Sequence, residues 1–350
     1  MHVPDGFFNV AVSVSAGAVA AAGVAVCLRG ARRELDDRTA PMAGLVSAFI
    51  FAVQMLNFPV ALGTSGHLLG GALAAVLVGP YTAVLCLAVV LLVQGFFFAD
   101  GGLTALGVNI TLMGIVTVVV GWAVFRALTR ILGGGRGAVV ASSAVAALLS
   151  VPASALVFTL LFWLGGNAPI EVGAVAAAMG GVHVLIGIGE ALITGATVSA
   201  VLAVRPDLVY GARGLAGPLL LRAADGTTSE VAPAAAAPAR TGAARPGGFL
   251  LAGIVVTALL AGIASFYASS SPDGLERVAE DKGFGAVATD HALGEQPLAD
   301  YGESGGIPVG VAGLIGVGVT LAVGGGLFFA VRRRGRRLAE GARGEERVDA

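Results

Sequence analysis

The sequence predicts an all-helical integral membrane protein, and two observations support that prediction. Hydrophobic residues make up 56% of the chain and charged residues only 12%, with a mean hydropathy of +0.89. Because a soluble domain carries about 25% charged residues, this composition excludes an ordinary soluble protein. The second observation is a series of apolar runs, each close to the roughly 20 residues that a helix needs to cross a bilayer.

The apolar runs predict where the membrane helices lie. In chain order they are 7–28, 42–62, 104–125, 138–164, 172–204, 248–268 and 307–331. The stretch 67–98 is too long for one ordinary span and is interrupted at Gly79-Pro80. Since proline removes a backbone donor and clashes with the preceding turn of a helix, we expect two shorter helices there. The chain would then have a seven-helix unit before residue 205 and a two-helix module after it.

Arginine clusters predict how these helices are oriented. The clusters are at 29–38, 126–136, 205–245 and 332–337. Cytoplasmic loops carry an excess of Lys and Arg, and all four clusters fall on one side only if 67–98 forms two helices. The amino terminus is then extracytoplasmic and the carboxyl terminus cytoplasmic in a multi-pass plasma-membrane protein. No basic residue precedes the first apolar run, so we expect that run to be retained rather than cleaved.

The first two residues carry a possible metal chelator. The Met1 amine, the deprotonated His2 amide nitrogen and His2 Nδ1 can close two fused chelate rings on one ion. An all-nitrogen, square-planar set suits Ni(II) or Cu(II), with Co(II) possible. Most proteins with histidine at position 2 bind no metal there, so this signal is weak alone.

A second histidine is predicted at the same outer face. His67 follows a Gly-rich segment, Gly63-Thr64-Ser65-Gly66, whose glycines permit close backbone approach. His183 lies inside the seventh predicted span, where an ionisable group is a functional candidate, although a hydrogen-bonded packing role is equally expected. His291 lies in a polar loop, where solvation is the simpler role.

Three segments of the sequence, taken in order, resemble a known family. These are Met1-His2-Val3-Pro4-Asp5-Gly6-Phe7; Asn57-Phe58-Pro59-Val60 with Gly63-Thr64-Ser65-Gly66-His67-Leu68-Leu69-Gly70-Gly71; and Asp100-Gly101-Gly102-Leu103-Thr104-Ala105-Leu106-Gly107-Val108-Asn109. Together they look like the CbiM/NikM family, the substrate-capturing membrane components of energy-coupling-factor importers for cobalt and nickel. The resemblance covers about residues 1–205 and implies that the Met1 amine, the His2 amide and side chain, and the His67 side chain hold the metal.

Other polar residues are candidates to orient those ligands. The candidates are Asn57, Ser65, Asp100 and His183, together with Gln54, Gln94, Asn109 and Glu190. Packing between helices is the more common role for each of Gln54, Asn57, Gln94, Asp100, Asn109 and Glu190 taken separately.

The rest of the chain has the composition of an appended module. Residues 206–247 are rich in Ala and Pro, as in a flexible cytoplasmic linker. Residues 248–331 hold two spans around an extracytoplasmic loop at 269–306, and 332–350 form a charged cytoplasmic tail.

One segment of the 269–306 loop carries a second resemblance. The segment Ser271-Pro272-Asp273-Gly274-Leu275-Glu276 resembles the PDGLE domain, and the two-span layout is similar to CbiN and NikN. Asp273 and Glu276 could share a cation if this segment were helical. However, Pro-Asp-Gly more often forms a turn. We therefore favour a turn over a ligand role for these two residues.

The predicted function rests on the resemblance of the seven-helix unit to metal-capture proteins and on the absence of an ATP-binding motif from the sequence. The chain has no Gly-x-x-x-x-Gly-Lys-Ser/Thr phosphate loop, so it is not expected to be an enzyme. The resemblance implies a coupling transmembrane (T) subunit and cytoplasmic ABC ATPases as partners, with no nucleic acid. It predicts import of Ni²⁺ or Co²⁺ as substrate, with no resident cofactor, for nickel enzymes or cobalamin synthesis; the square-planar set favours nickel.

Two other classes of function stay open. A metal channel or exporter needs a continuous polar pathway, and these spans hold only scattered polar residues. A metal sensor without transport needs an output domain, and 206–247 is too poor in apolar residues to form one.

Overall fold

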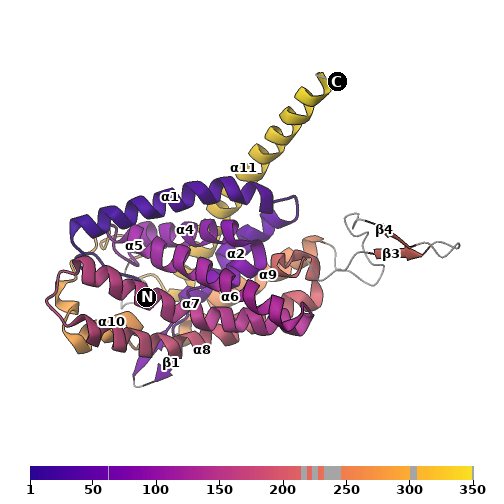
Figure 1. The fold of residues 1–350 in the computed structure, drawn as a ribbon. Coiled ribbons are helices and arrows are strands. Elements are labelled where there is room, and N and C mark those ends of the chain that lie inside the picture. The colour runs from indigo at the N-terminus through magenta and orange to yellow at the C-terminus, as the bar shows by residue number, and fades with distance from the viewer. Residues whose placement is uncertain (62, 214–218, 223–227, 232–245, 300–305, 349–350) are drawn as a thin grey trace.

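The structure is a computed structural model, and it describes residues 1–61, 63–213, 219–222, 228–231, 246–299 and 306–348. It is a bundle of long helices that run side by side (Figure 1). The principal helices are α1 (Val10–Glu34), α2 (Thr39–Gln54), α3 (Gly71–Val78), α4 (Pro80–Phe97), α6 (Thr117–Leu132), α7 (Arg136–Gly165), α8 (Val172–Val204), α9 (Pro246–Gly262) and α11 (Val309–Val348). A short helix α5 (Leu106–Asn109) and a π-helical segment η1 (Ile110–Val116) lead directly into α6.

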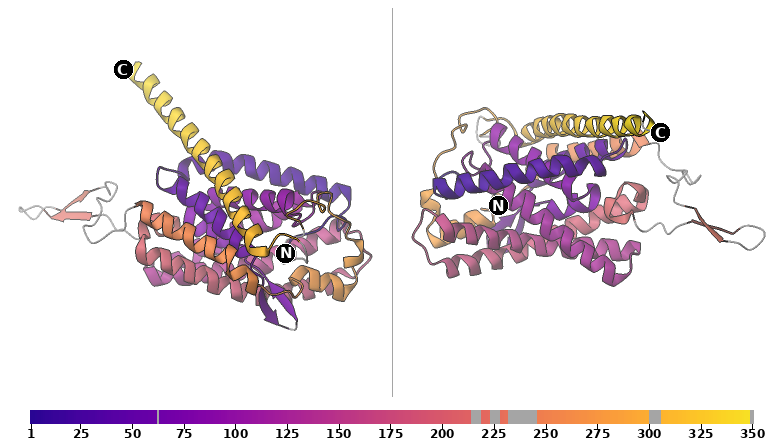
Figure 2. Two further views of the ribbon diagram at one scale, coloured as in Figure 1. Left: turned by 180° about the vertical axis from the view of Figure 1, so that it is seen from behind. Right: turned by 45° about the horizontal axis from the view of Figure 1, so that its top comes forward.

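Seven helical segments of the described chain are long and apolar enough to cross a membrane. The principal helices outside this set are α2, with 16 residues, and α3, with 8; α6 reaches the required length together with α5 and η1, and α9 together with η4. The protein is therefore an all-helical, multi-pass membrane protein, as the composition predicted. The carboxyl-terminal part of α11 projects beyond the bundle (Figure 2).

The stretch 67–98 forms two helices, as the Gly79-Pro80 pair predicted. Gly79 separates α3 from α4 with a φ of 94°, a value that favours glycine. Pro80 is the first residue of α4, where its missing N–H is not needed. The buried Glu34 carboxylate caps α4, because it accepts hydrogen bonds from the Thr82 backbone N–H at 2.7 Å and from the Thr82 hydroxyl at 2.8 Å.

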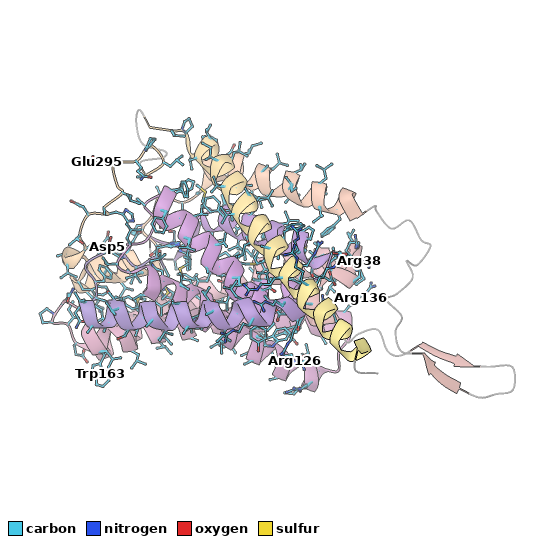
Figure 3. The ribbon with its side chains drawn as sticks, turned by 90° about the horizontal axis from the view of Figure 1, so that it is seen from above. Asp5, Arg38, Arg126, Arg136, Trp163 and Glu295 are labelled. Atoms are coloured by element: carbon cyan, nitrogen blue, oxygen red, sulfur yellow. The ribbon has the colours of Figure 1, made fainter. Side chains whose placement is uncertain are left out.

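Arginines of the predicted clusters lie at one end of the bundle, and the amino-terminal segment lies at the other. Figure 3 shows Arg38, Arg126 and Arg136 at one end and Asp5 at the opposite end. The carboxyl-terminal cluster joins the same basic end, since Arg332 forms an ion pair with Asp37 at 3.0 Å. The side of the membrane that each end faces remains a prediction.

Short elements complete the end that holds the amino terminus. A hairpin of β1 (Phe58–Ala61) and β2 (Thr64–Gly66) lies between α2 and α3. Between α9 and α11 the chain forms the turn η4 (Ala264–Tyr267), the helix α10 (Gly274–Lys282) and the turn η5 (Gly285–Val287).

The start of α10 corrects the expectation of a turn at Pro-Asp-Gly. Asp273 is the N-cap of α10: its Oδ1 accepts hydrogen bonds from the N–H groups of Leu275 at 2.7 Å and Glu276 at 2.9 Å. Glu276 Oε2 accepts in return from the Asp273 N–H at 2.8 Å. This reciprocal capping box satisfies the open donors of the first helical turn, so a helix replaces the expected turn.

Short elements lie in the parts of the predicted linker that the structure describes. The turns η2 (Pro206–Leu208) and η3 (Tyr210–Ala212) pack on the bundle, and β3 (Leu219–Arg222) pairs with β4 (Thr228–Val231). The other residues of 206–247, apart from 209, 213, 246 and 247, lie outside the described ranges.

Candidate metal centre

The amino-terminal residues are folded into the helix bundle, and Met1 and Val3 are buried. The Val3 N–H donates to Asn109 Oδ1 at 2.8 Å, and Asn109 Nδ2 donates to the Val3 carbonyl at 3.1 Å. The same carbonyl accepts a hydrogen bond from the Gly102 N–H at 2.9 Å. The side chain of Asn109 thus pairs with the amino-terminal backbone as a neighbouring strand would, and it fixes where Met1 and His2 lie.

Asp5 fastens the next turn of the amino-terminal segment. Its carboxylate accepts hydrogen bonds from the Leu103 N–H at 3.1 Å, the Thr104 N–H at 2.7 Å and the Thr104 hydroxyl. Its carbonyl accepts a hydrogen bond from the Thr289 N–H at 3.0 Å. The Asp5-Gly6 motif therefore anchors the terminus to the loop before α5 and to the carboxyl-terminal module.

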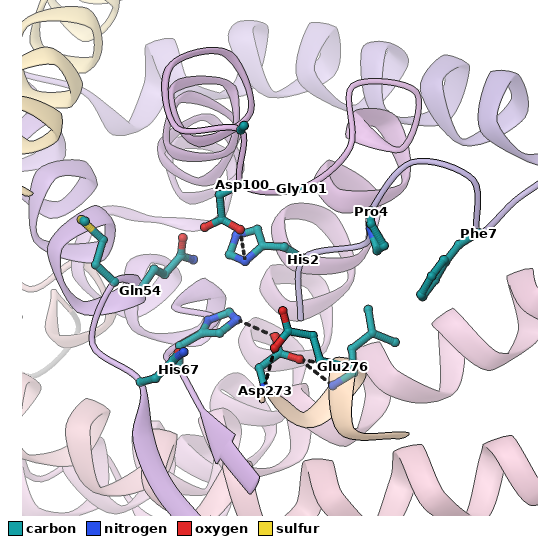
Figure 4. A pocket seen from close by; sticks show the side chains of 13 residues that line it. His2, Pro4, Phe7, Gln54, His67, Asp100, Gly101, Asp273 and Glu276 are labelled. Carbon is teal, nitrogen blue, oxygen red and sulfur yellow. Dashed lines mark hydrogen bonds and ion pairs between the residues drawn. The ribbon is translucent and has the colours of Figure 1, made fainter. Parts of the chain in front are cut away.

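The Met1 amine and the His67 imidazole meet in the interior. The amine contacts His67 Nε2 and lies 2.6 Å from Asp273 Oδ2. The same Oδ2 atom lies 3.5 Å from His67 Nε2 (Figure 4). His67 Nδ1 lies 3.1 Å from the Leu68 carbonyl oxygen. Because a carbonyl only accepts, we assign the proton to Nδ1, which leaves the Nε2 lone pair directed at the amine.

The His2 side chain lies beside this contact. Its ring stacks on that of His67, with centroids 4.9 Å apart. His2 Nε2 lies 3.1 Å from Gln94 Oε1, and Nδ1 lies 3.3 Å from Asp100 Oδ1. Burial lowers the pKa of His2 to about 4 in spite of the Asp100 charge, so the imidazole is neutral at physiological pH, as a metal ligand must be. The predicted chelate through Nδ1 would exchange its contact with Asp100 for the metal.

A cavity of about 360 Å³ opens beside these groups, lined by His2, His67, Asp100, Asp273 and Glu276 among others. Within the described residues, no three His, Cys, Asp or Glu side chains gather as a metal-binding group. Main-chain nitrogen at the amino terminus would be available to an ion held here, besides the side chains. The Met1 amine and the His2 amide are the main-chain nitrogens that the sequence predicts for this purpose.

The other predicted residues are near the site but differ in role. Asp100 faces His2. Asn57 lines the cavity, and its carbonyl accepts a hydrogen bond from the Ser269 N–H at 2.7 Å. Ser65 donates its hydroxyl hydrogen to the Ser271 carbonyl at 2.7 Å, so it joins β2 to the carboxyl-terminal module. His183 is buried in α8, with Nδ1 2.8 Å from the Met179 carbonyl oxygen, and does not line the cavity.

Glu190 supports the residues that follow His67. From α8, its buried carboxylate accepts hydrogen bonds from the Leu69 N–H at 2.7 Å and the Gly70 N–H at 3.0 Å. Gln54 Nε2 donates to the Leu69 carbonyl at 3.1 Å. The bundle thus holds the backbone next to His67 from two sides.

Asp273 is the residue that the sequence argument did not favour. Burial alone would raise the pKa of its carboxyl, but the positive Met1 amine beside it outweighs burial and holds that pKa well below its usual range. The available signal was the spacing of Asp273 and Glu276, which is that of an N-cap and its partner three residues later. No local pattern indicated that this cap would meet residue 1.

Known proteins with similar sequences or structures are metal transporters. The chain is 34% identical over 230 residues to the fused nickel transport protein NikMN of Rhodobacter capsulatus, covering 62% of this chain and 66% of that protein. It is 36% identical over 155 residues to the cobalt transport protein CbiM of Geobacter sulfurreducens, covering 43% of each. A crystal structure of a transition metal transporter superposes with a TM-score of 0.53 at 27% identity, covering 62% of this chain and all of that one.

Two family models match the chain in separate regions. The CbiM model, described as the cobalt uptake substrate-specific transmembrane region, matches residues 2–208, and the PDGLE domain matches residues 247–333. The first match covers more than half of the chain and includes both His2 and His67. The chain therefore belongs to the CbiM family and carries a carboxyl-terminal PDGLE domain.

Proposed function

We propose that this protein is the substrate-binding membrane component of an energy-coupling-factor importer for Ni²⁺ or Co²⁺. The observation that carries the proposal is the contact between the Met1 amine and His67 Nε2, with neutral His2 stacked beside them. Three nitrogen-bearing groups converge there, two from the first two residues and one from the distant His67. Such nitrogen donors suit late first-row divalent metals far better than Mg²⁺ or Ca²⁺.

Capture would proceed by exchange of water for nitrogen. A hydrated ion enters the cavity, where the Asp100, Asp273 and Glu276 side chains offer negative charge. The Met1 ammonium and the His2 amide each lose a proton as they bind the metal. His2 and His67 contribute imidazole nitrogens, and His67 connects the amino terminus to the segment that leads into α3.

The direction of transport is proposed from charge. The basic end of the bundle, with Arg38, Arg126 and Arg332, would face the cytoplasm, so the metal site would open to the outside. The sequence has no phosphate loop. Release to the cytoplasm would therefore depend on a coupling transmembrane subunit and ATP-hydrolysing subunits from other chains.

Metal analysis of the purified protein tests the proposal. Protein whose intact mass confirms Met1 as the first residue would be offered equimolar Ni²⁺, Co²⁺, Cu²⁺ and Zn²⁺ and then desalted. We expect the protein to retain one of the four metals at a stoichiometric amount. When Ni²⁺ and Co²⁺ are each offered alone in a second experiment, we expect at least one of them to be retained. Retention of none of the four would overturn the proposal.

A further inference from the structure

Asp273 belongs to the carboxyl-terminal module, yet its side chain lies in the candidate metal centre. The two oxygens of its carboxylate have separate tasks. Oδ1 accepts the hydrogen bonds that cap α10, whereas Oδ2 lies 2.6 Å from the Met1 amine. Oδ2 also lies 3.5 Å from His67 Nε2 (Figure 4). Asp273 is only 7% exposed, so solvent does little to weaken these contacts.

The position of Asp273 is fixed by contacts on both sides along the chain. Before it, the Ser65 N–H donates to the Pro272 carbonyl at 2.9 Å. After it, Gly274 packs so closely on α8 that an added Cβ would lie 2.6 Å from Ile186 Cδ1 and 3.2 Å from His183 Cε1. A side chain at position 274 would therefore require α10 or the facing Ile186 side chain to shift.

Apolar packing holds α10 and the residues after it against the amino-terminal segment. Leu275 and Val278 are buried, and so is Phe284. The Phe284 ring lies 5.5 Å from the Phe7 ring and 5.0 Å from the Phe162 ring, between centroids. The module therefore packs directly on the segment that carries the Met1 amine.

The chemistry of a metal-bound amine explains what Oδ2 can do. A free ammonium has three N–H donors, and an amine bound to a metal keeps two. A carboxylate at hydrogen-bond distance can accept from the amine in both states, and this contact sets the direction of the nitrogen lone pair. Its negative charge also offsets the net positive charge of a divalent ion that has only one deprotonated amide among its ligands.

We propose that Asp273 is a positioning residue of the metal centre, which acts through the Met1 amine and makes the PDGLE domain part of the site. This inference rests on the proposed metal-binding function. Oδ2 lies nearer to the amine than to His67, which assigns it a hydrogen bond to the amine rather than a place among the ligands. Loss of such an outer partner typically lowers metal affinity 10–100-fold, roughly.

The test uses substitutions that keep the helix cap. Asn and Ser cap helices about as well as Asp, so Asp273→Asn and Asp273→Ser preserve α10 but remove the charged Oδ2. In the full-length protein we expect Ni²⁺ affinity to fall by about 10–100-fold in both variants. We also expect the visible absorption band of the bound Ni²⁺ to shift, because the amine loses its acceptor.

Two controls separate this role from a structural one. Asp290→Asn removes an exposed charge from the same loop and should keep wild-type affinity and spectrum. Val278→Ala loosens the packing of α10 but keeps the Asp273 carboxylate, so the absorption band of the bound Ni²⁺ should stay at its wild-type position even if the affinity falls. Wild-type behaviour in Asp273→Asn and Asp273→Ser, or a Val278→Ala variant with the same band shift as these two, would overturn the inference while wild-type binding leaves the proposed function intact. A wild-type protein that binds no metal would overturn both.

Discussion

The Met1 amine and the His67 imidazole are in direct contact although 66 residues separate them in the sequence. The contact depends on the amino-terminal segment lying inside the bundle, where Asn109 and Asp5 fix its backbone. Met1 is only 2% exposed, so a residue added before it would displace this segment. The position of the terminus is therefore a property that experiments can test directly.

Residues added before Met1 should abolish metal binding. A peptide bond would replace the amine, which would remove one ligand and displace the chelate from its buried position. The measurement is metal content after desalting, with membrane insertion and a cooperative thermal transition as evidence that the extended protein is folded. Equal metal content in the folded extended protein and the native protein would contradict the ligand role of the amine.

Substitution of His67 should weaken binding far more than substitution of the other candidate histidines. His67→Ala removes the Nε2 donor. His291 lies in the polar loop 269–306, and neither His291 nor His183 lines the cavity. We expect at least a tenfold loss for His67→Ala, about 1.4 kcal/mol, and little change for His291→Ala in Ni²⁺ titrations. His67→Cys should instead shift the metal preference, since a thiolate is a softer donor. Unchanged affinity in His67→Ala with lost binding in His183→Ala would move the site to α8.

The helices and the His67 candidate were predictable because their signals are local. Hydropathy indicated the spans, Gly79-Pro80 indicated the break between α3 and α4, and the arginine clusters indicated the shared basic end. Each of these signals lies within a few residues of the feature it predicts. The predicted topology placed His2 and His67 on one face of the bundle, and in the structure their rings stack.

The role of Asp273 was not predictable in the same way. Its capping box is local, and Glu276 at the third helical position was a usable sign that Pro-Asp-Gly begins a helix. Its contact with Met1 joins residues that are 272 positions apart and results from the packing of Gly274 and Phe284 on the bundle. Periodicity and composition carry no information about such a contact.

Glu190 should prove necessary for the geometry of the segment after His67. Glu190→Gln would place an amide N–H₂ group where the carboxylate accepts from Leu69 and Gly70, and would leave a buried donor without an acceptor. A buried donor without an acceptor lowers the free energy of unfolding by about 1–3 kcal/mol. Ni²⁺ affinity should also fall, because the backbone next to His67 loses its support. The matched control is Thr194→Val, one turn further along α8, where the buried hydroxyl has no hydrogen-bond partner in the described chain. Thermal unfolding and Ni²⁺ titration of both variants decide the matter: equal behaviour of Glu190→Gln and Thr194→Val would contradict the support proposed here.

Gly102 should be required for the amino terminus to dock. A Cβ at this position would collide with the Asp5 backbone nitrogen and lie 2.5 Å from Asp5 Oδ1, so Gly102→Ala must displace the segment that Asp5 anchors. Overpacking of this kind costs about 1–3 kcal/mol, and we expect the displaced amine to lose metal as well. Gly137→Ala is the control, because nothing lies within 4 Å of its added Cβ. The measurements are thermal unfolding of the metal-free protein and Ni²⁺ titration. Since the clash is at Asp5 and not at the metal ligands, wild-type metal affinity in Gly102→Ala would mean that binding does not depend on the docked amino-terminal segment.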